Sequence, residues 1–533
     1  MKSTDSMKTL YEILRHVSVE PIMFIISMTT FMRQPTNQLL VLHKVCLLNY
    51  NATTCNHIMT VDVENDIQAD TAYWNFYLKM ALLIPGAVVS SLYGPLSDKL
   101  GRRVFLIIPS VGNIFGAVAL IIQSEIPLMP LEYLLATELI VGLSGNVVTT
   151  YVVAKSYLCD ITDRTNRTKR LGVVKSMSYF GGPVGAFLSG ILVDREGFAS
   201  VYYIIAGIHV FIVIYVAVWL QESRGADHHD KGGDLELEDG MGEHSEQEDH
   251  HKDGAEKEVD ETTDDASTRK ENKTDEDNVM CRLCGVTRQG LTEVFKGIEN
   301  MLFVCFRERV GFRRKHLVIV QLIGIIHNIG SSAESDLTVL YTKHSPLNWS
   351  ATTIGFFFTL RTVLKALTLS LGLPLFFKLA KHHSLRMDLS LASFGIISTT
   401  SALVMISFAE TTTVMMIAPF VGMFVGFPSL ILNAIKSKLV EPYEYGALFA
   451  FTALIQTLTS TAGSAMFSSI YAASLATWPG LAFMVTALIY VVSLGLISYL
   501  WFDMKKAAED DQRYQSDDGS GYEKVDTTDE ESD

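Results

Sequence analysis

The chain has 533 residues, of which 48% are hydrophobic and 19% are charged, and its formal net charge is −15. A soluble protein of this length would be expected to divide into several domains with charges spread over all of them. Here the acidic residues gather in residues 222–279 and 503–533, and the rest of the chain is net basic. The acidic balance therefore describes two hydrophilic segments, and it gives no support to a nucleic-acid partner.

Apolar runs long enough to cross a bilayer recur along the chain. Because a membrane-crossing helix needs about 20 mostly apolar residues, we predict twelve spans, at roughly 19–42, 73–97, 104–123, 129–158, 171–193, 199–221, 317–341, 351–379, 387–408, 413–438, 446–473 and 478–502. Two sets of six predict an all-α membrane protein with twelve transmembrane helices in two six-helix bundles, residues 19–221 and 317–502. We expect broken helices around a central site at Pro35, at Gly181-Gly182-Pro183 and at Gly426-Phe-Pro428.

Basic residues in the short loops give the orientation. The loops after spans 2, 4, 8 and 10 hold clusters of Lys and Arg, whereas the opposite loops hold few. By the positive-inside rule, the N-terminal residues 1–18, the linker 222–316 and the tail 503–533 are cytoplasmic. The sequons at Asn51 and Asn348 fall in loops on the other side, so we expect glycosylation there.

The linker and the tail have compositions unlike the spans. Residues 222–279 are rich in acids and have too little apolar surface to fold, so we expect an acidic, disordered tether and no metal site. Residues 289–315 have the pattern of an amphipathic helix on the anionic inner leaflet. In the tail, Tyr522 to Val525 resembles a sorting signal for adaptors; we nevertheless expect the plasma membrane rather than an endosome or lysosome.

A charged turn lies between the second and third spans and carries Gly94, Asp98, Lys99, Gly101, Arg102 and Arg103. Gly94 allows two helices to approach closely, and Gly101 permits a tight reversal. The basic residues anchor the loop at the cytoplasmic face, and Asp98 can face a helix N-terminus or a basic partner. The pattern resembles the loop signature of the major facilitator superfamily, which implies a gating motif that latches one half against the other in the outward-open state.

Ionisable residues within the spans are the candidates for transport, because they are costly in lipid and usually functional. Arg33, Arg361 and Lys365 are the cationic candidates for binding substrate, and the last two share one helical face. An excess of cations suggests an organic anion as substrate. For proton coupling the candidates are acids and an imidazole: Glu138, His327, Glu334 and Asp336.

Four stretches resemble solute carrier family 46, the family of the proton-coupled folate transporter. They are Val19-Glu20-Pro21, the 94–103 loop, Asp336-Leu-Thr-Val-Leu-Tyr341, and Lys436-Ser-Lys438 followed by Gly446-Ala-Leu-Phe449. The resemblance covers the membrane body and implies proton-driven uptake of anionic organic solutes. It also implies a substrate-binding role for Asn433, where the family has an arginine, and only an approximate match of His327 to the family histidine.

Other positions depart from the family pattern. Asn146 and Lys175 stand where the family has acids in spans 4 and 5. Cys55 matches one half of a family disulfide, and Cys46 can pair with it in place of the partner expected near residue 348. Proton coupling would then depend on Glu138 and on the two acids of span 7.

We therefore expect a secondary active transporter that imports an organic anion by alternating access, coupled to protons and functional as a monomer in the lipid bilayer. Two alternatives stay open: an exporter of drugs or metabolites with the same fold, and a non-transporting receptor or scaffold that uses the acidic linker. No paired acid and base, nucleophile or cofactor motif stands out, so we expect neither an enzyme nor a bound cofactor.

Overall fold

A computed structural model describes residues 18–50, 55, 60–162, 164–223, 303, 305, 307, 313–379, 385–440 and 444–518. Several predictions of the sequence lie outside these residues: the sequon at Asn51, the acidic tether beyond Ser223, almost all of the amphipathic segment 289–315, and the tail signal at 522–525. The side chains of Asp98, Lys99 and Lys175 also lie outside the description.

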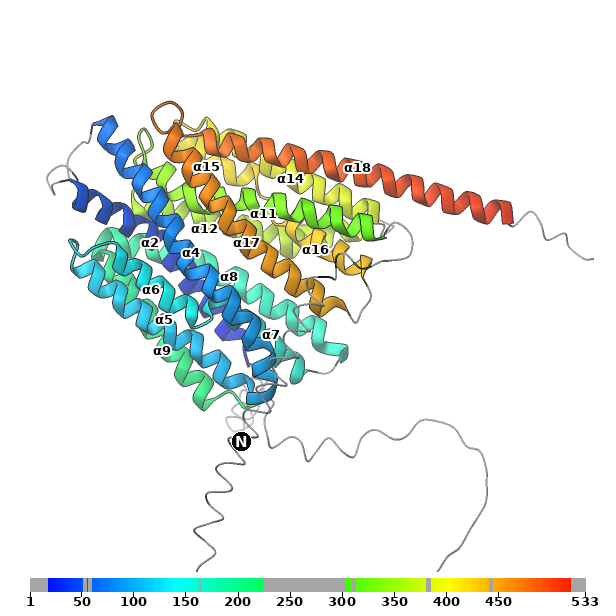
Figure 1. Cartoon of the computed structure of the whole chain (residues 1–533), viewed down its shortest axis with the longest axis horizontal. Helices are drawn as coiled ribbons and strands as arrows, with labels where there is room; N and C mark the ends of the chain where they lie inside the picture. The colour runs from blue at the N-terminus through cyan, green and yellow to red at the C-terminus, as the bar shows by residue number, and fades with distance from the viewer. Residues whose placement is uncertain are drawn as a thin grey trace, which may run out of the picture.

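Helices of the N-terminal half form one bundle, drawn from blue to green in Figure 1. They are α2 (Glu20–Asn49), α4 (Val61–Leu100), α5 (Arg102–Glu125), α6 (Glu132–Leu143), α7 (Asn146–Asp160), α8 (Arg164–Glu196) and α9 (Phe198–Val218). The predicted fourth span is divided between α6 and α7, because Gly145 takes a left-handed conformation with φ of 100°.

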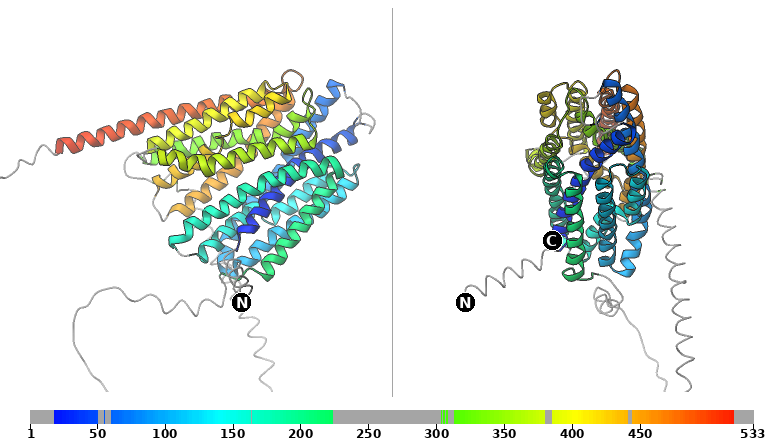
Figure 2. Two further views of the ribbon diagram at one scale, coloured as in Figure 1. Left: turned by 180° about the vertical axis from the view of Figure 1, so that it is seen from behind. Right: turned by 90° about the vertical axis from the view of Figure 1, so that its left-hand side faces the viewer.

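Helices of the C-terminal half form a second bundle beside the first (Figures 1 and 2). They are α11 (Arg313–Lys343), α12 (Ala351–Leu367), the π-turn η2 (Thr368–Gly372), α13 (Leu373–Leu379), α14 (Leu385–Ser407), α15 (Thr412–Val421), α16 (Phe427–Leu439), α17 (Tyr445–Ser474) and α18 (Leu481–Asp518). The prediction of an all-α membrane fold is confirmed.

Eight helical segments of the described chain are long and apolar enough to cross a membrane. The four other predicted spans correspond to α2, α4, α15 with α16, and α17. Polar positions interrupt some of these four, such as Gln34, Asn37 and Gln38 in α2. Polar residues on a span are tolerated where it faces a cavity or another helix instead of lipid.

Three details differ from the sequence predictions. Helix α2 continues through Pro35, and α8 continues through Pro183, so neither proline breaks its helix. Only the predicted break before Pro428 coincides with a gap between helices, that between α15 and α16. Helix α18 runs past the predicted boundary at residue 502 to Asp518, since the residues that follow are good helix formers.

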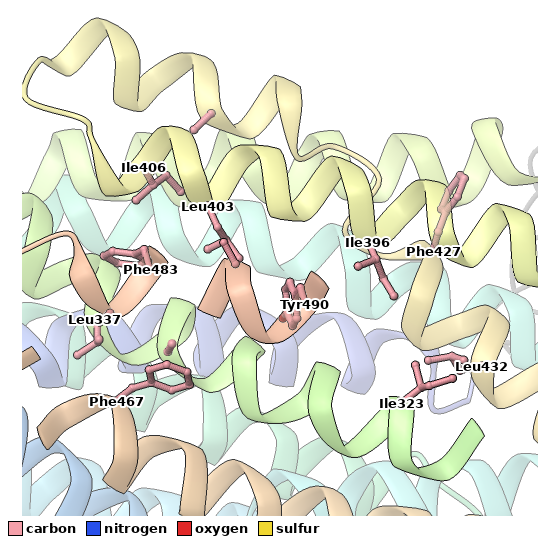
Figure 3. Close-up of a cluster of buried hydrophobic side chains, with 14 of the residues drawn as sticks. Ile323, Leu337, Ile396, Leu403, Ile406, Phe427, Leu432, Phe467, Phe483 and Tyr490 are labelled. Atoms are coloured by element: carbon pink, nitrogen blue, oxygen red, sulfur yellow. The ribbon is translucent and has the colours of Figure 1, made fainter. Parts of the chain in front are cut away.

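The apolar core of the C-terminal bundle is shown in Figure 3, where side chains of α11, α14, α16, α17 and α18 meet. Phe467, Phe483 and Leu403 are at most 1% exposed. The hydroxyl of Tyr490, whose ring lies among them, donates to the carbonyl of His327 at 3.1 Å. This packing holds α11, which carries the acids of span 7, against α17 and α18.

Two glycines form a close contact between the bundles, where α8 of the first packs on α12 of the second. A Cβ atom on Gly190 would lie 2.5 Å from the carbonyl oxygen of Ala351, and one on Gly355 would lie 2.6 Å from that of Ala186. Such distances leave no room for a side chain, so these glycines let the two backbones touch.

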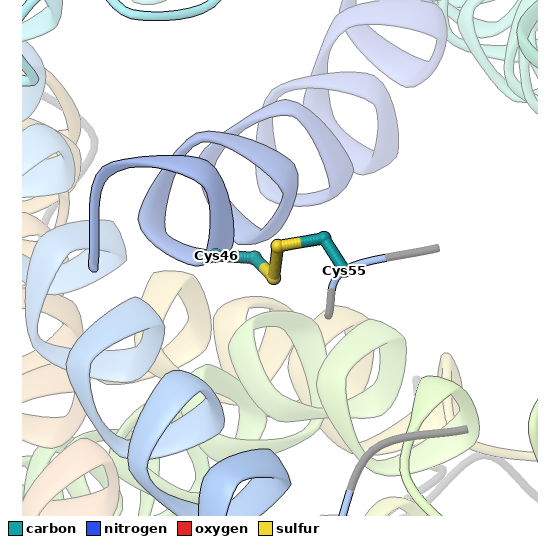
Figure 4. Close-up of a disulfide and its surroundings, with 2 residues drawn as sticks. All are labelled: Cys46 and Cys55. Carbon is teal, nitrogen blue, oxygen red and sulfur yellow. A yellow bond between two sulfur atoms is a disulfide. The ribbon is translucent and has the colours of Figure 1, made fainter. Parts of the chain in front are cut away.

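A disulfide joins Cys46, near the end of α2, to Cys55, which lies between α2 and α4 in the sequence (Figure 4). Their Cα atoms are 6.0 Å apart, within the usual range for a disulfide. This is the pairing that the sequence analysis gave as possible. Asn348, the second predicted sequon, is exposed in the loop before α12, with φ of 45°.

Candidate functional site

A cavity of about 310 Å³ lies between the two bundles. Helices α2, α7 and α8 form one wall, and α11 and α12 form the other. The lining combines hydroxyl and amide groups with aromatic rings: Ser27, Gln34, Gln38, Ser178, Ser335 and Thr362, and Phe31, Tyr151, Tyr179 and Phe358. A concave site with an apolar body and a few polar groups is typical of a small-molecule site.

The two cations of span 8 both line this cavity. Arg361 and Lys365 lie one helical turn apart on α12. Arg361 also forms an ion pair with Glu334 of α11, whose side chain is 9% exposed. Among the described residues that line the cavity there is no carboxylate, so its charged groups are these two cations.

An ion pair crosses between the bundles at one side of the cavity. The amine of Lys79, on α4, lies 2.7 Å from a carboxylate oxygen of Asp336, on α11. Nearby, the side-chain amides of Gln34 and Gln38 donate to the carbonyl of Ser335 at 3.3 Å and 3.2 Å. Sequence reasoning missed Lys79, although a lone lysine in the outer third of a predicted span was a usable signal.

Further contacts join the bundles on the predicted extracellular side. Asp194, at the end of α8, accepts hydrogen bonds from the backbone N–H groups of Ala351 and Thr352 at 3.1 Å and 2.7 Å. His344 lies 2.9 Å from the side chain of Asn65, which is near the start of α4. The inter-bundle hydrogen bonds of the described residues thus run from this end to the middle of the helices, so they join the bundles on the side that the sequence predicts to be extracellular.

Arg33 and Glu138 form a separate polar network inside the N-terminal bundle. Their side chains are 2.8 Å apart, and Asn37 donates to the same Glu138 oxygen at 2.9 Å. Arg33 also donates to Asn113 at 3.3 Å, and the Tyr202 hydroxyl donates to Asn37 at 2.8 Å. Neither Arg33 nor Glu138 lines the central cavity, so the predicted excess of cations is reduced by pairing.

His327 and Asn433 lie on a second, smaller cavity within the C-terminal bundle. The His327 ring stacks on Tyr490, with ring centroids 5.3 Å apart. Asn433 is on α16 and does not line the cavity that holds Arg361. Asn433, a candidate for substrate binding, and His327, a candidate for proton coupling, therefore line a different cavity from Arg361 and Lys365.

The segment 94–103, predicted as a turn, is helical except at Gly101, and it is tied to its own bundle. Gly101 has φ of 96° and separates α4 from α5. The Arg102 side chain lies 3.0 Å from Asp160, at the end of α7, and its backbone N–H donates to Glu222 at 2.6 Å. Arg103 donates to backbone carbonyls at the end of α9. These contacts join α5 to α7, to α9 and to Glu222. The latch that the sequence predicts for the outward-open state, in which Asp98 and Lys99 take part, stays a prediction.

A two-bundle helical fold with a cavity between its halves defines a membrane transporter. The family model described as Major Facilitator Superfamily matches residues 23–329, which is more than half of the chain. The chain belongs to this superfamily. Because the superfamily is one of transporters, the expectation that the chain is not an enzyme is confirmed.

Curated relatives narrow the resemblance from the superfamily to one family within it. The chain is 24% identical over 494 residues to the "Lysosomal proton-coupled steroid conjugate and bile acid symporter SLC46A3" of Gallus gallus, covering 90% of this chain and 93% of that protein. It is 23% identical to the "Proton-coupled folate transporter" of Rattus norvegicus, covering 90% and 91%. The predicted resemblance to solute carrier family 46 is therefore confirmed.

Solved structures agree on the fold. A POT family transporter in complex with 5-aminolevulinic acid superposes with a TM-score of 0.57 at 10% identity, covering 90% of this chain and 96% of that one. The human organic anion transporter MFSD10 (TETRAN) superposes with a TM-score of 0.53 at 12% identity, covering 90% and 99%.

Proposed function

We propose that this protein imports an organic anion across the membrane, coupled to protons, by alternating access. The observation that carries the proposal is the central cavity, which is lined by Arg361 and Lys365 and has no carboxylate among its described lining residues. Cationic groups in a site of low dielectric constant attract an anion strongly, because water screens them less there.

The ion pair between Glu334 and Arg361 supplies a means of coupling. While Glu334 is ionised, it competes with an anionic substrate for the same guanidinium group. A proton arriving from the acidic side would neutralise Glu334 and leave Arg361 to bind the substrate bidentately. Loss of that proton to the cytoplasm would restore the ion pair and favour release of the anion. Glu334 is thus the proton carrier in this proposal.

The lining favours an amphipathic anion. Phe31, Tyr179 and Phe358 offer an apolar surface for a ring system, while the hydroxyl and amide groups can orient polar substituents. The printed names of the two relatives, a steroid conjugate and bile acid symporter and a folate transporter, support the same class of solute.

Closed outer contacts support an inward-facing state, with Lys79 and Asp336 as the outer closure. In this state the cavity would release its substrate to the cytoplasm. In this proposal, Asp336 helps to close the outer side of the cavity and does not carry the proton. Glu138 belongs to the polar network that fixes α2 against α6.

Uptake into proteoliposomes tests the proposal. The purified full chain would be given a labelled sulfated steroid, bile acid or folate on the acidic side of a pH gradient. We expect the unmodified protein to take up the anion, and we expect uptake to fall at least about 10-fold in Arg361→Ala and in Lys365→Ala. Each change deletes about 1.5–3 kcal/mol of charge-assisted binding. The matched control is Lys378→Ala, at an exposed lysine further along the same span, which should transport normally. Equal uptake by all four proteins would refute the cavity assignment.

The Glu334→Gln variant tests the coupling. It mimics the protonated acid, so uptake should no longer depend on external pH, while exchange of labelled for unlabelled anion continues. A wild-type pH profile in this variant would exclude Glu334 as the proton carrier.

The membrane in which the protein resides is a separate part of the proposal. We retain the plasma membrane as its expected location, although the relatives' names do not favour that membrane over the lysosome. Surface biotinylation of the tagged full chain, compared with co-staining for lysosomes, distinguishes the two. Exclusive lysosomal staining would contradict our expectation without affecting the transport mechanism.

A further inference from the structure

The second cavity has the features of a site for a small anion. It has a volume of about 60 Å³ and lies within the C-terminal bundle, between α11, α16 and α17. Its residues come from the halves of these helices that lie toward the predicted cytoplasmic face. The volume is far below that of the central cavity, so it would hold an ion and no conjugated organic molecule.

Lys436 of α16 is a buried cation in this cavity. The residue is only 2% exposed, and its amine donates a hydrogen bond of 3.5 Å to the side-chain oxygen of Asn433, which is at the outer limit for such a bond. A Cβ on Gly324 of α11 would lie 3.2 Å from this amine, so the glycine leaves the cation room against the opposite helix. Among the described residues that line the cavity there is no carboxylate to balance the charge.

Two other lining side chains carry a nitrogen that can donate a hydrogen bond. The Nδ1 atom of His327 is buried and has no hydrogen-bond partner among the described residues. The Oε1 atom of Gln321 accepts a hydrogen bond from Thr452 at 3.4 Å. The amide nitrogen of the same side chain can therefore act as a donor. A buried charge with unsatisfied polar neighbours is costly unless a counter-ion completes the site.

From these observations we propose that the cavity beside Lys436 binds one small inorganic anion, of the size of chloride. Chloride occupies about the volume of one water molecule, roughly 30 Å³, so the cavity can hold it with its donors around it. Asn433 and Gln456 are exposed at the edge of the cavity, so the ion can enter there. The bound anion would fix α16 against α11, and thereby hold together the bundle that carries the central cavity.

Among the described residues, one other group interacts electrostatically with Lys436. The thiol of Cys305, from the linker, is 3% exposed and close enough to interact with the amine. Serine is uncharged at neutral pH, so Cys305→Ser removes any negative charge that the thiol supplies. Cys305→Ser should therefore keep the response to chloride described below.

Thermal unfolding of the purified full chain tests the proposal. Tryptophan fluorescence would be followed in sodium chloride and in sodium gluconate at equal ionic strength, because gluconate is too large for the cavity. We expect a saturable rise in unfolding temperature with chloride, on the order of 2–4 °C. Equal unfolding temperatures in the two salts would overturn the proposal.

Substitutions assign the effect to the cavity. Lys436→Gln should lose the chloride response, whereas Lys438→Gln, which removes an exposed lysine two residues along the same helix, should keep it. Asn433→Asp places a carboxylate beside Lys436, so this variant should be equally stable in both salts. If Lys436→Gln does not fold, Asn433→Asp still decides the matter. A chloride response that persists in either cavity variant would overturn the proposal.

Discussion

The Lys79–Asp336 ion pair gives the sharpest structural prediction, because it joins the two bundles across the outer side. The charged atoms are 2.7 Å apart, and the side chains are 19% and 11% exposed. An exposed pair contributes up to about 1 kcal/mol, while breaking a buried pair costs about 3–5 kcal/mol. For this half-buried pair we take about 2 kcal/mol, which shifts the ratio of outward-open to closed molecules by roughly 30-fold.

Asp336→Asn should therefore raise the outward-open population. The assay would place a cysteine in the cavity lining by Ser178→Cys and follow its modification by a membrane-impermeant maleimide from the extracellular side. We expect roughly 30-fold faster modification than in Ser178→Cys alone. Exchanging the charges, Lys79→Asp with Asp336→Lys, should restore the slow rate.

The matched control breaks an ion pair inside one bundle. Asp388 on α14 lies 2.6 Å from the amine of Lys438 on α16. Asp388→Asn should leave the rate of modification unchanged, because both partners move together when the bundles rock. Equal rates in Asp336→Asn and Asp388→Asn would refute the assignment of the outer closure.

Three further predictions follow from the fold. Gly355→Val should reduce transport about 10-fold or more at normal expression, because the new side chain would clash with α8 where the two bundles meet. Gly207→Val, at a position with open space around it, should be neutral in the same uptake assay. Arg102→Gln should lower the thermal unfolding temperature by several degrees, because it leaves Asp160 half-satisfied at a cost of about 1–3 kcal/mol; an unchanged melting curve would contradict this. Asn348→Gln should increase mobility on a gel by the loss of one glycan, and an unchanged band would show that this sequon is not used.

The sequence predicted the architecture well because membrane helices can be recognised by their length and their apolar composition. It also located Arg361 and Lys365, since two cations four residues apart on a span share one face. The same reasoning misjudged how continuous the helices are. A proline removes one hydrogen bond, and packing on neighbouring helices can hold the helix together around it, as at Pro35 and Pro183.

Pairing between distant helices was beyond the reach of the sequence. Nothing in the local pattern connects Lys79 with Asp336, or Arg33 with Glu138, because the partners lie on different helices and meet only through tertiary packing. Counting cations therefore overestimated the unbalanced positive charge. His327 looked like a partner for Glu334 two turns along one helix, yet it stacks on Tyr490 and faces the smaller cavity.

The most direct test of the central claim is the proton flux that an anion evokes. Proteoliposomes with a pH-sensitive dye inside would hold the purified full chain, and a sulfated steroid, bile acid or folate would be added outside at acidic pH. Our account predicts that at least one of these anions accelerates acidification of the interior, and that Arg361→Ala abolishes the acceleration while Lys378→Ala preserves it. Acidification that is unaffected by every anion, or that is equally fast in Arg361→Ala, would contradict coupling through the cavity.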